Sequence, residues 1–516
     1  MIEEKLIVEM LQNHKQTFLK GISFSYIYIA VYLITGILTT PMLLNHFQAD
    51  YFALLMLVNA IITYLNHIRL GLPESLAAMI AKSNDITFNI SMVRSSFLLL
   101  VKILLLSFIV FFILDLLVDD WRYFLGNVFV LNKENVLSVF YILIIFALIK
   151  IPLELSLSIF IGFHEVYLEK IYKILTLLAN FSLVFFTIYT SQDIVFYAFL
   201  AGLLDLFISI IAFIHMYIKY AVFIKNVSIQ KIPEKKLLKD GVLFFQVLMI
   251  QTLIWSAGIF FVSHMLSLGD VTTYSLTMKV YIYIFYAFII VNSVLAPLYG
   301  KYFADKSWRT MNQIFNLTII LLPFIGGFVW FSTLYFMVDI IALWTGSNQF
   351  YIGSLYVLFM GVFFYFTGYV NSYVTLLYSI GEVKSIVYAR YKEVALNLFV
   401  SAVLTYSIGL AGIAIGMAFA IMATSARYLP KYLQEKTQDK IFIDFSIQKK
   451  HFFFVLLPNV ILAFVVTNLI ETVVIKLLIF ISMSILYIIF SWRLISHEDK
   501  YNIISFINKK KVMVEK

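Results

Sequence analysis

The positions of the lysine and arginine residues constrain this chain more than any other feature. About fourteen apolar runs are long enough to cross a bilayer. They lie near residues 21–44, 50–67, 93–116, 136–162, 172–189, 194–217, 242–266, 273–298, 313–343, 350–378, 393–409, 411–427, 451–469 and 474–492. If the N-terminus is cytoplasmic, 32 of the 38 basic residues fall in inside segments and only three fall outside. This asymmetry follows the positive-inside rule and predicts a multi-pass membrane protein with both termini in the cytoplasm.

The composition excludes the soluble protein classes. The chain is 62% hydrophobic and 13% charged, whereas soluble domains have about a quarter charged residues. Fourteen spans of ~20 residues would use about 280 residues, so only short connections remain. We attribute the net charge of +9 to loops that face anionic lipid of the inner leaflet, and we expect no nucleic-acid partner.

The chain carries no enzyme signature. It has no cysteine, which excludes disulfides, thiolate catalysis and zinc–thiolate sites. It also lacks an HExxH motif and a Walker A motif. The largest outside loop, near 117–135, is too short to form a catalytic domain. We therefore expect a protein that is not an enzyme and that needs no cofactor or metal.

The lengths of the inside segments divide the chain into six, six and two spans. We predict an interfacial amphipathic N-terminus at 1–20, an N-lobe at 21–217, a basic cytoplasmic linker at 218–241, a C-lobe at 242–428, a second cytoplasmic linker at 429–450, a terminal helix pair at 451–493 and a basic cytoplasmic tail at 494–516. Near the end of the C-lobe, Gly412, Gly416, Ala420 and Thr424 recur every four residues, which predicts close packing against a neighbouring helix.

A weak internal repeat agrees with this division. Gly21 and Asp50 are 29 residues apart, and so are Gly241 and Asp270, 220 residues later. Six spans in each half keep the start of both halves in the cytoplasm. The repeat would therefore be parallel, with its axis along the membrane normal, as in transporters that bind substrate between their halves.

Two segments resemble the polysaccharide-transporter (Wzx-like) branch of the MOP superfamily. Residues 21–82 resemble its opening, with Pro41 near the outer end of the first span and a Leu-Gly-Leu turn at residue 70 before a small-residue amphipathic stretch. The segment YSIGLAGIAIGMAFA, residues 406–420, resembles its glycine-rich hairpin before the last pair of spans. The related lipid II flippases carry several arginines in their first two spans. This chain differs from them, because its first span contains no charge and Arg69 lies only at the inner end of the second.

The resemblance implies two six-helix lobes that open alternately to either side of the membrane. It also implies the usual cargo of this branch, an undecaprenyl-pyrophosphate-linked oligosaccharide such as an O-antigen or capsule repeat unit. The leading hypothesis is a flippase that moves this lipid across the bacterial cytoplasmic (inner) membrane. The alternatives are a MATE-like, cation-coupled drug or organic-cation antiporter and a membrane-embedded polysaccharide polymerase. The antiporter predicts an acidic cavity and usually twelve spans, and the polymerase predicts a large outside loop.

Ionisable residues inside the spans are the candidates for chemistry, because each costs about 2.5–3.5 kcal/mol at bilayer depth. Lys150 and Glu154 lie four residues apart on one helix face, with Pro152 between them. One interpretation is a self-neutralising pair. The other is that Lys150 binds pyrophosphate in a cavity while Glu154 tunes it, with Pro152 as a hinge.

Asp205 lies midway along its span, where a lone carboxylate is least stable. It should either pair with a lysine, for which Lys102 is a candidate, or hold a proton. Asp205 and Glu154 are thus candidates for a coupling-ion site, and structural pairing remains the alternative.

The remaining substrate-binding candidates are Lys102, Lys279, Arg69, Gln251 and Asn59. Lys279 is the only basic residue within a span of the second half, and a lysine near an interface could also snorkel. The two amides could bind sugars in a cavity or connect helices. As partners we expect the lipid-linked oligosaccharide and membrane lipids, with the polymerase and chain-length machinery as further candidates, and we expect a monomer.

Overall fold

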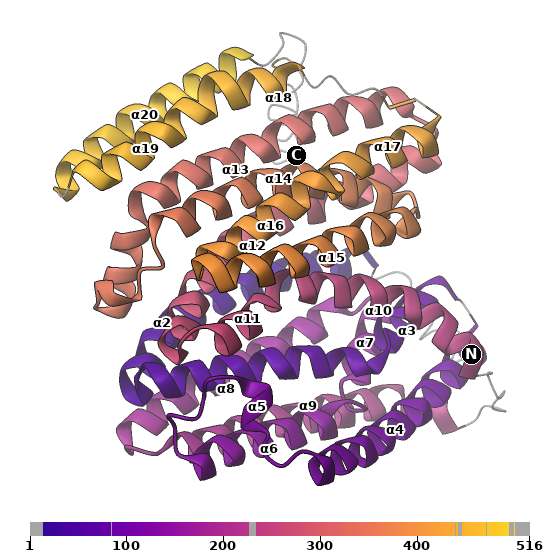
Figure 1. The fold of residues 1–516 in the computed structure, drawn as a ribbon. Helices are drawn as coiled ribbons and strands as arrows, with labels where there is room; N and C mark the ends of the chain where they lie inside the picture. The colour runs from indigo at the N-terminus through magenta and orange to yellow at the C-terminus, as the bar shows by residue number, and fades with distance from the viewer. Residues whose placement is uncertain are drawn as a thin grey trace. The chain divides into compact units, whose positions relative to one another are not determined.

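The computed structural model describes residues 14–83, 85–225, 234–438, 440–441, 446–470, 472–494 and 500. Within these residues every regular element is a helix and no strand is present (Figure 1). The predicted all-α fold is therefore confirmed. The chain divides into two compact units, Met1–Thr272 and Thr273–Lys516.

The first unit is built from long helices interrupted by short ones. Its elements are α2 (His14–Leu65), η1 (Asn66–Arg69), α3 (Leu72–Lys82), α4 (Ile86–Leu117), α5 (Arg122–Leu125), α6 (Lys133–Lys150), α7 (Leu155–Gly162), α8 (Val166–Tyr189), α9 (Ile194–Lys225), α10 (Glu234–Ser256), α11 (Gly258–Met265) and the start of α12 (Leu268–Ala304). Helix α2 packs along α8, α6 packs against α9, and α3 contacts both α7 and α10.

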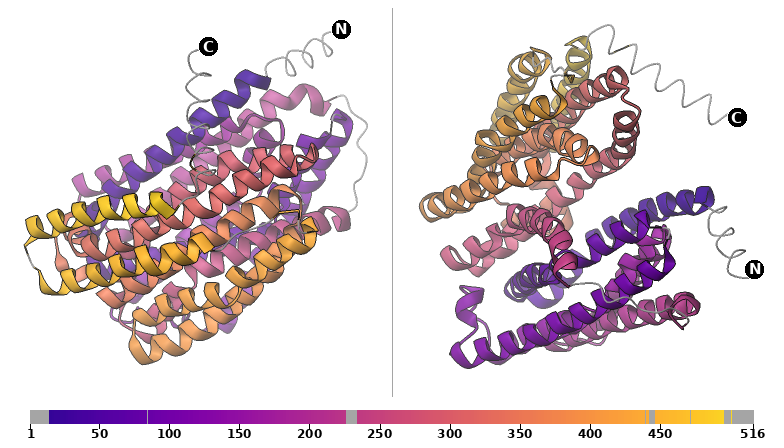
Figure 2. Two further views of the ribbon diagram at one scale, coloured as in Figure 1. Left: turned by 90° about the horizontal axis from the view of Figure 1, so that it is seen from above. Right: turned by 90° about the vertical axis from the view of Figure 1, so that its right-hand side faces the viewer.

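The second unit continues α12 and adds two helical hairpins and a terminal pair. Its further elements are α13 (Trp308–Thr345), η2 (Asn348–Phe350), α14 (Ser354–Ser379), α15 (Val383–Ile408), α16 (Ala411–Ala423), α17 (Ser425–Thr437), α18 (Ser446–His451), η3 (Phe452–Leu456), α19 (Leu457–Leu469) and α20 (Val473–Leu494). Figure 2 shows α19 and α20, in yellow, at one edge of this unit, where both contact α13.

Small residues allow α15 and α16 to pack closely. A Cβ added to Gly412 would lie 2.3 Å from the backbone of Leu404, and one added to Gly416 would lie 2.1 Å from the hydroxyl of Ser401. Real Cβ atoms do not approach other atoms this closely, so only glycine fits at these positions. The packing role predicted for the small-residue stripe is therefore confirmed for these two glycines.

Polar residues outside the apolar runs determine where several helices begin. The carboxylate of Asp85 accepts a hydrogen bond from the backbone N–H of Phe88, at 3.1 Å, at the start of α4. Asn132 accepts from the N–H of Glu134 at 2.8 Å and so caps α6. Such caps satisfy N–H groups that have no partner within the helix.

Twelve helical segments of the described part are long and apolar enough to span a membrane. Two of the fourteen predicted spans, 21–44 and 50–67, fall within one of them, where α2 kinks at Gln48. The predicted span 393–409 lies in α15, which is not among the twelve. Multi-pass membrane topology is thus supported, and the count of fourteen stays a prediction.

The boundary between the compact units lies elsewhere than the predicted linker. The units divide within α12, after Thr272, so α10 and α11 belong to the first unit. A division into compact units does not show which helices move together as one lobe. The predicted lobe boundary at 218–241 therefore stays a prediction. The central residues of that linker, 226–233, the first 13 residues and nearly all of the tail at 494–516 lie outside the described residues.

The turn between η1 and α3 brings two backbones together in the first unit. Leu70 and Gly71 both have a left-handed conformation, with φ of 53° and 67°. A Cβ added to Gly71 would lie 2.3 Å from the carbonyl oxygen of Gly241 and 2.6 Å from the amide nitrogen of Phe245. Glycine is required here both for its positive φ and for this approach of α10.

We expect Gly71→Ala to destabilise the protein strongly, because two backbone segments would have to separate. Gly346→Ala is the matched control, since Gly346 has a φ of 76° and no atom lies within 4 Å of its added Cβ. The control should cost only the conformational term of about 1–2 kcal/mol. Melting temperatures of the purified variants in detergent check this, and equal losses for the two would contradict the packing explanation.

Candidate functional site

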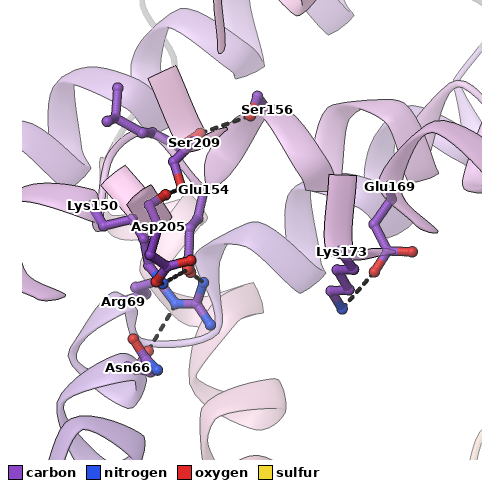
Figure 3. A network of polar contacts seen from close by, with 10 residues as sticks. Asn66, Arg69, Lys150, Glu154, Ser156, Glu169, Lys173, Asp205 and Ser209 are labelled. Atoms are coloured by element: carbon purple, nitrogen blue, oxygen red, sulfur yellow. Dashed lines mark hydrogen bonds and ion pairs between the residues drawn. The ribbon is translucent and has the colours of Figure 1, made fainter. Parts of the chain in front are cut away.

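Four of the residues singled out in the sequence form one charged network in the first unit (Figure 3). We define the charged network as Arg69, Lys150, Glu154 and Asp205. The guanidinium of Arg69 binds Oε2 of Glu154. The Nζ of Lys150 lies 3.0 Å from Oε1 of Glu154 and 2.5 Å from Oδ2 of Asp205. Glu154 therefore bridges the two cations, and Lys150 bridges the two carboxylates.

Interruptions in the helices place three of these side chains. Arg69 is the last residue of η1, and its Nε donates to the carbonyl of Asn66 at 2.8 Å, which orients the guanidinium. Lys150 ends α6, and Pro152 falls in the turn before α7 begins at Leu155. Because proline lacks an N–H, it cannot continue the hydrogen-bond ladder of α6. The N–H of Glu154 still bonds to the carbonyl of Lys150, at 3.1 Å, so the turn keeps their side chains together.

The charged network balances two positive charges with two negative ones. Its side chains are 15–18% exposed for Lys150, Glu154 and Arg69, and 33% exposed for Asp205. An isolated charge at bilayer depth is costly, and pairing with hydrogen bonds offsets that cost. The network is therefore well suited to joining η1, α6 and α9 without leaving a net charge.

Asp205 is paired with a lysine, which was one of its two predicted states. Its partner is Lys150, which comes from the adjacent helix α6. Lys102, the candidate partner predicted from the sequence, lies on α4 with an exposed side chain. The coupling-ion role of Asp205 and Glu154 stays a prediction.

The other candidate residues are not members of the charged network. The exposed Asn59 of α2 donates to the carbonyl of Leu55, one turn earlier, at 2.8 Å. Gln251 is exposed on α10. Lys279 is half-buried on α12 and belongs to the second unit. Their predicted roles in substrate binding stay predictions.

A second charged cluster was missed by the sequence reasoning. Glu169 near the start of α8 pairs with Lys170 at 2.9 Å and with Lys173 at 2.5 Å. Figure 3 shows Glu169 and Lys173 beside the charged network. The spacing of Glu169 and Lys173 by four residues was a readable signal of an ion pair. Both lysines also fit the positive-inside rule, which accounts for them without an ion pair.

The described part of the chain offers no group of three or more histidine, cysteine, aspartate or glutamate residues that could hold a metal ion. The charged side chains described above can bind and orient polar groups of a ligand.

Comparisons with solved structures show the fold. The lipid II flippase MurJ in its inward closed conformation aligns with a TM-score of 0.66 at 15% identity, over 92% of this chain and 99% of that chain. An inward-facing multidrug resistance MATE family transporter aligns with a TM-score of 0.62 at 14% identity, over 80% and 96%. A MOP superfamily transporter from Pyrococcus furiosus aligns with a TM-score of 0.58 at 16% identity, over 83% and 96%.

A comparison with curated protein sequences finds no match. The sequence profile of the family described as "Polysaccharide biosynthesis protein" matches residues 18–303, which is more than half of the chain. The helices, their span lengths and the structural alignments all agree with a multi-pass membrane protein. The protein therefore belongs to this polysaccharide biosynthesis family and has the fold of the MOP superfamily.

Proposed function

We propose that this protein is a flippase for a polyprenyl-pyrophosphate-linked oligosaccharide, of the O-antigen or capsule repeat-unit type. It carries the lipid from the inner to the outer leaflet of the bacterial cytoplasmic membrane by alternating access. One observation carries the proposal: a family profile for polysaccharide biosynthesis matches a chain whose fold aligns with a lipid II flippase over nearly its full length. The protein acts as a monomer with both termini in the cytoplasm.

The polarity and charge of the proposed cargo mean that it needs a protein to cross the membrane. An oligosaccharide carries many hydroxyl groups, and each hydroxyl costs several kcal/mol in hydrocarbon without a hydrogen bond. A pyrophosphate adds negative charge, whose isolated transfer costs far more. A protein lowers such costs by offering polar side chains as hydrogen-bond partners in place of water.

The charged network contributes to this function as a positioning element. Lys150 is already bound by two carboxylates, so a phosphate would have to displace both before Lys150 could bind it. Its role is therefore to hold Glu154 and Asp205, and through them the relative positions of η1, α6 and α9. This refines the expectation that Lys150 binds the pyrophosphate directly.

The location of the lipid-linked oligosaccharide tests the proposed function. In cells depleted of this protein, we expect the lipid-linked unit to accumulate on the cytoplasmic side, protected from periodate or lectin added outside. Unpolymerised units that are accessible from outside would contradict the proposal and favour a polymerase. Normal surface polysaccharide, together with proton- or sodium-coupled efflux of organic cations from vesicles, would contradict it in favour of the antiporter.

Neutralising Lys150 tests the positioning role. Lys150→Gln leaves one carboxylate unbalanced and should cost ~1–3 kcal/mol, below the 3–5 kcal/mol typical of fully buried pairs because solvent reaches these side chains. The double variant Lys150→Gln/Asp205→Asn leaves only the Arg69–Glu154 pair. We expect it to recover most of the melting temperature and of the surface polysaccharide.

Lys82→Gln is the matched control for this experiment, because Lys82 is exposed at the end of α3. It removes the same charge and should change neither quantity. A double variant that regains its melting temperature but exports no polysaccharide would contradict the positioning role and would show that Lys150 or Asp205 acts in transport itself.

A further inference from the structure

The cluster at the start of α8 contains more positive charge than its carboxylate needs. The side chain of Glu169 is 3% exposed, with Oε1 at 2.5 Å from Lys173 Nζ and Oε2 at 2.9 Å from Lys170 Nζ. A single lysine would neutralise this carboxylate. The second lysine leaves one net positive charge, whereas the charged network next to it is balanced.

The two lysines differ from Glu169 in their exposure. Their side chains are 21% exposed for Lys170 and 44% exposed for Lys173, so a ligand can reach both. Oε2 of Glu169 is buried, and the contact described above is its ion pair with Lys170 at 2.9 Å. Because an ammonium group has three N–H donors, this ion pair leaves Lys170 able to donate to a ligand.

Helix electrostatics do not explain the two lysines. The first turns of a helix favour negative charge, and Glu169 in the first turn of α8 fits that preference. Lysines in the same turns oppose it. The positive-inside rule requires basic residues on the cytoplasmic side, but it does not require two of them around one buried carboxylate.

An aromatic ring lies against both ammonium groups. The Nζ atoms of Lys170 and Lys173 lie 5.3 and 5.9 Å from the centroid of the Tyr28 ring, on the neighbouring helix α2. Tyr28 is half-buried, and its ring lies 6.3 Å from that of Tyr32, one turn further along α2. Cation–π contacts of this kind hold the ammonium groups in place. Tyr28 therefore lies beside any group that the two ammonium groups bind.

We propose that Lys170, Lys173 and Tyr28 form an anion site that binds the diphosphate of the lipid-linked substrate, with the lysines on the phosphates and the tyrosine beside the first sugar. The identity of the ligand rests on the proposed function, and the site itself rests on the contacts above. Two adjacent ammonium groups suit a diphosphate, because charge-assisted hydrogen bonds to phosphate are strong in a weakly polar environment. The electrostatic interaction of Lys173 with Glu154 connects this site to the charged network.

Binding to the full-length protein in phosphatidylcholine nanodiscs tests the site. The probe is undecaprenyl diphosphate, titrated with tryptophan fluorescence as the readout, with inorganic pyrophosphate and phosphatidylglycerol as competitors. Lys170→Gln removes the surplus charge and keeps the Lys173–Glu169 pair, so the variant should fold. We expect at least about tenfold weaker binding, as loss of one charge-assisted contact implies.

Lys82→Gln controls for the loss of net charge and should bind the probe as the unchanged protein does. Glu169→Gln frees both lysines and should bind several-fold more tightly, even if its melting temperature falls. A purely structural cluster predicts no gain from Glu169→Gln and no loss from Lys170→Gln, and that pair of results would overturn the site.

The outcomes also separate the site from the proposed function. Strong binding to the unchanged protein that Lys170→Gln leaves intact would overturn the site alone. If phosphatidylglycerol competes as well as the probe, and Lys170→Gln weakens both, the site binds ordinary phospholipid and the assignment to the substrate is wrong. Inorganic pyrophosphate that competes in a Lys170-dependent manner would support a headgroup site.

Discussion

The cost of charge in hydrocarbon is the constraint on which the first unit depends. Each ionisable group there needs a partner of opposite charge, and the charged network supplies all four of its members with one. The end of α6 at Lys150 and the turn at Pro152 bring Glu154 within reach of both cations. The interruption of the helix after Lys150 is what allows the network to close.

The architecture could be read from the sequence because it follows from local properties. Apolar runs and basic loops predict helices and their orientation, and the spacing of Lys150 and Glu154 predicts their pairing. The other contacts were beyond such reasoning. Arg69 and Glu154 are 85 residues apart, and Lys150 and Asp205 are 55 apart, so their meeting depends on how the helices are rotated and shifted against one another.

The lysines of α8 illustrate a different limit. Lys170 and Lys173 satisfy the charge asymmetry of an inner segment, so nothing in the sequence demanded a second explanation. Their unusual feature is their surroundings: one buried carboxylate shared by two ammonium groups, against the ring of Tyr28 on another helix. A lysine whose position along the chain fits the positive-inside rule can therefore have a second role that depends on its neighbours in the folded protein.

The distances along the chain within the charged network have a consequence for biogenesis. When Lys150 and Glu154 leave the ribosome, Asp205 has not yet been synthesised, because 55 residues separate it from Lys150. During this interval the local Lys150–Glu154 pair reduces the net charge of its segment. Arg69 is synthesised before its partner Glu154, and Asp205 is synthesised only with α9. The complete network can therefore form only after α9 has been synthesised.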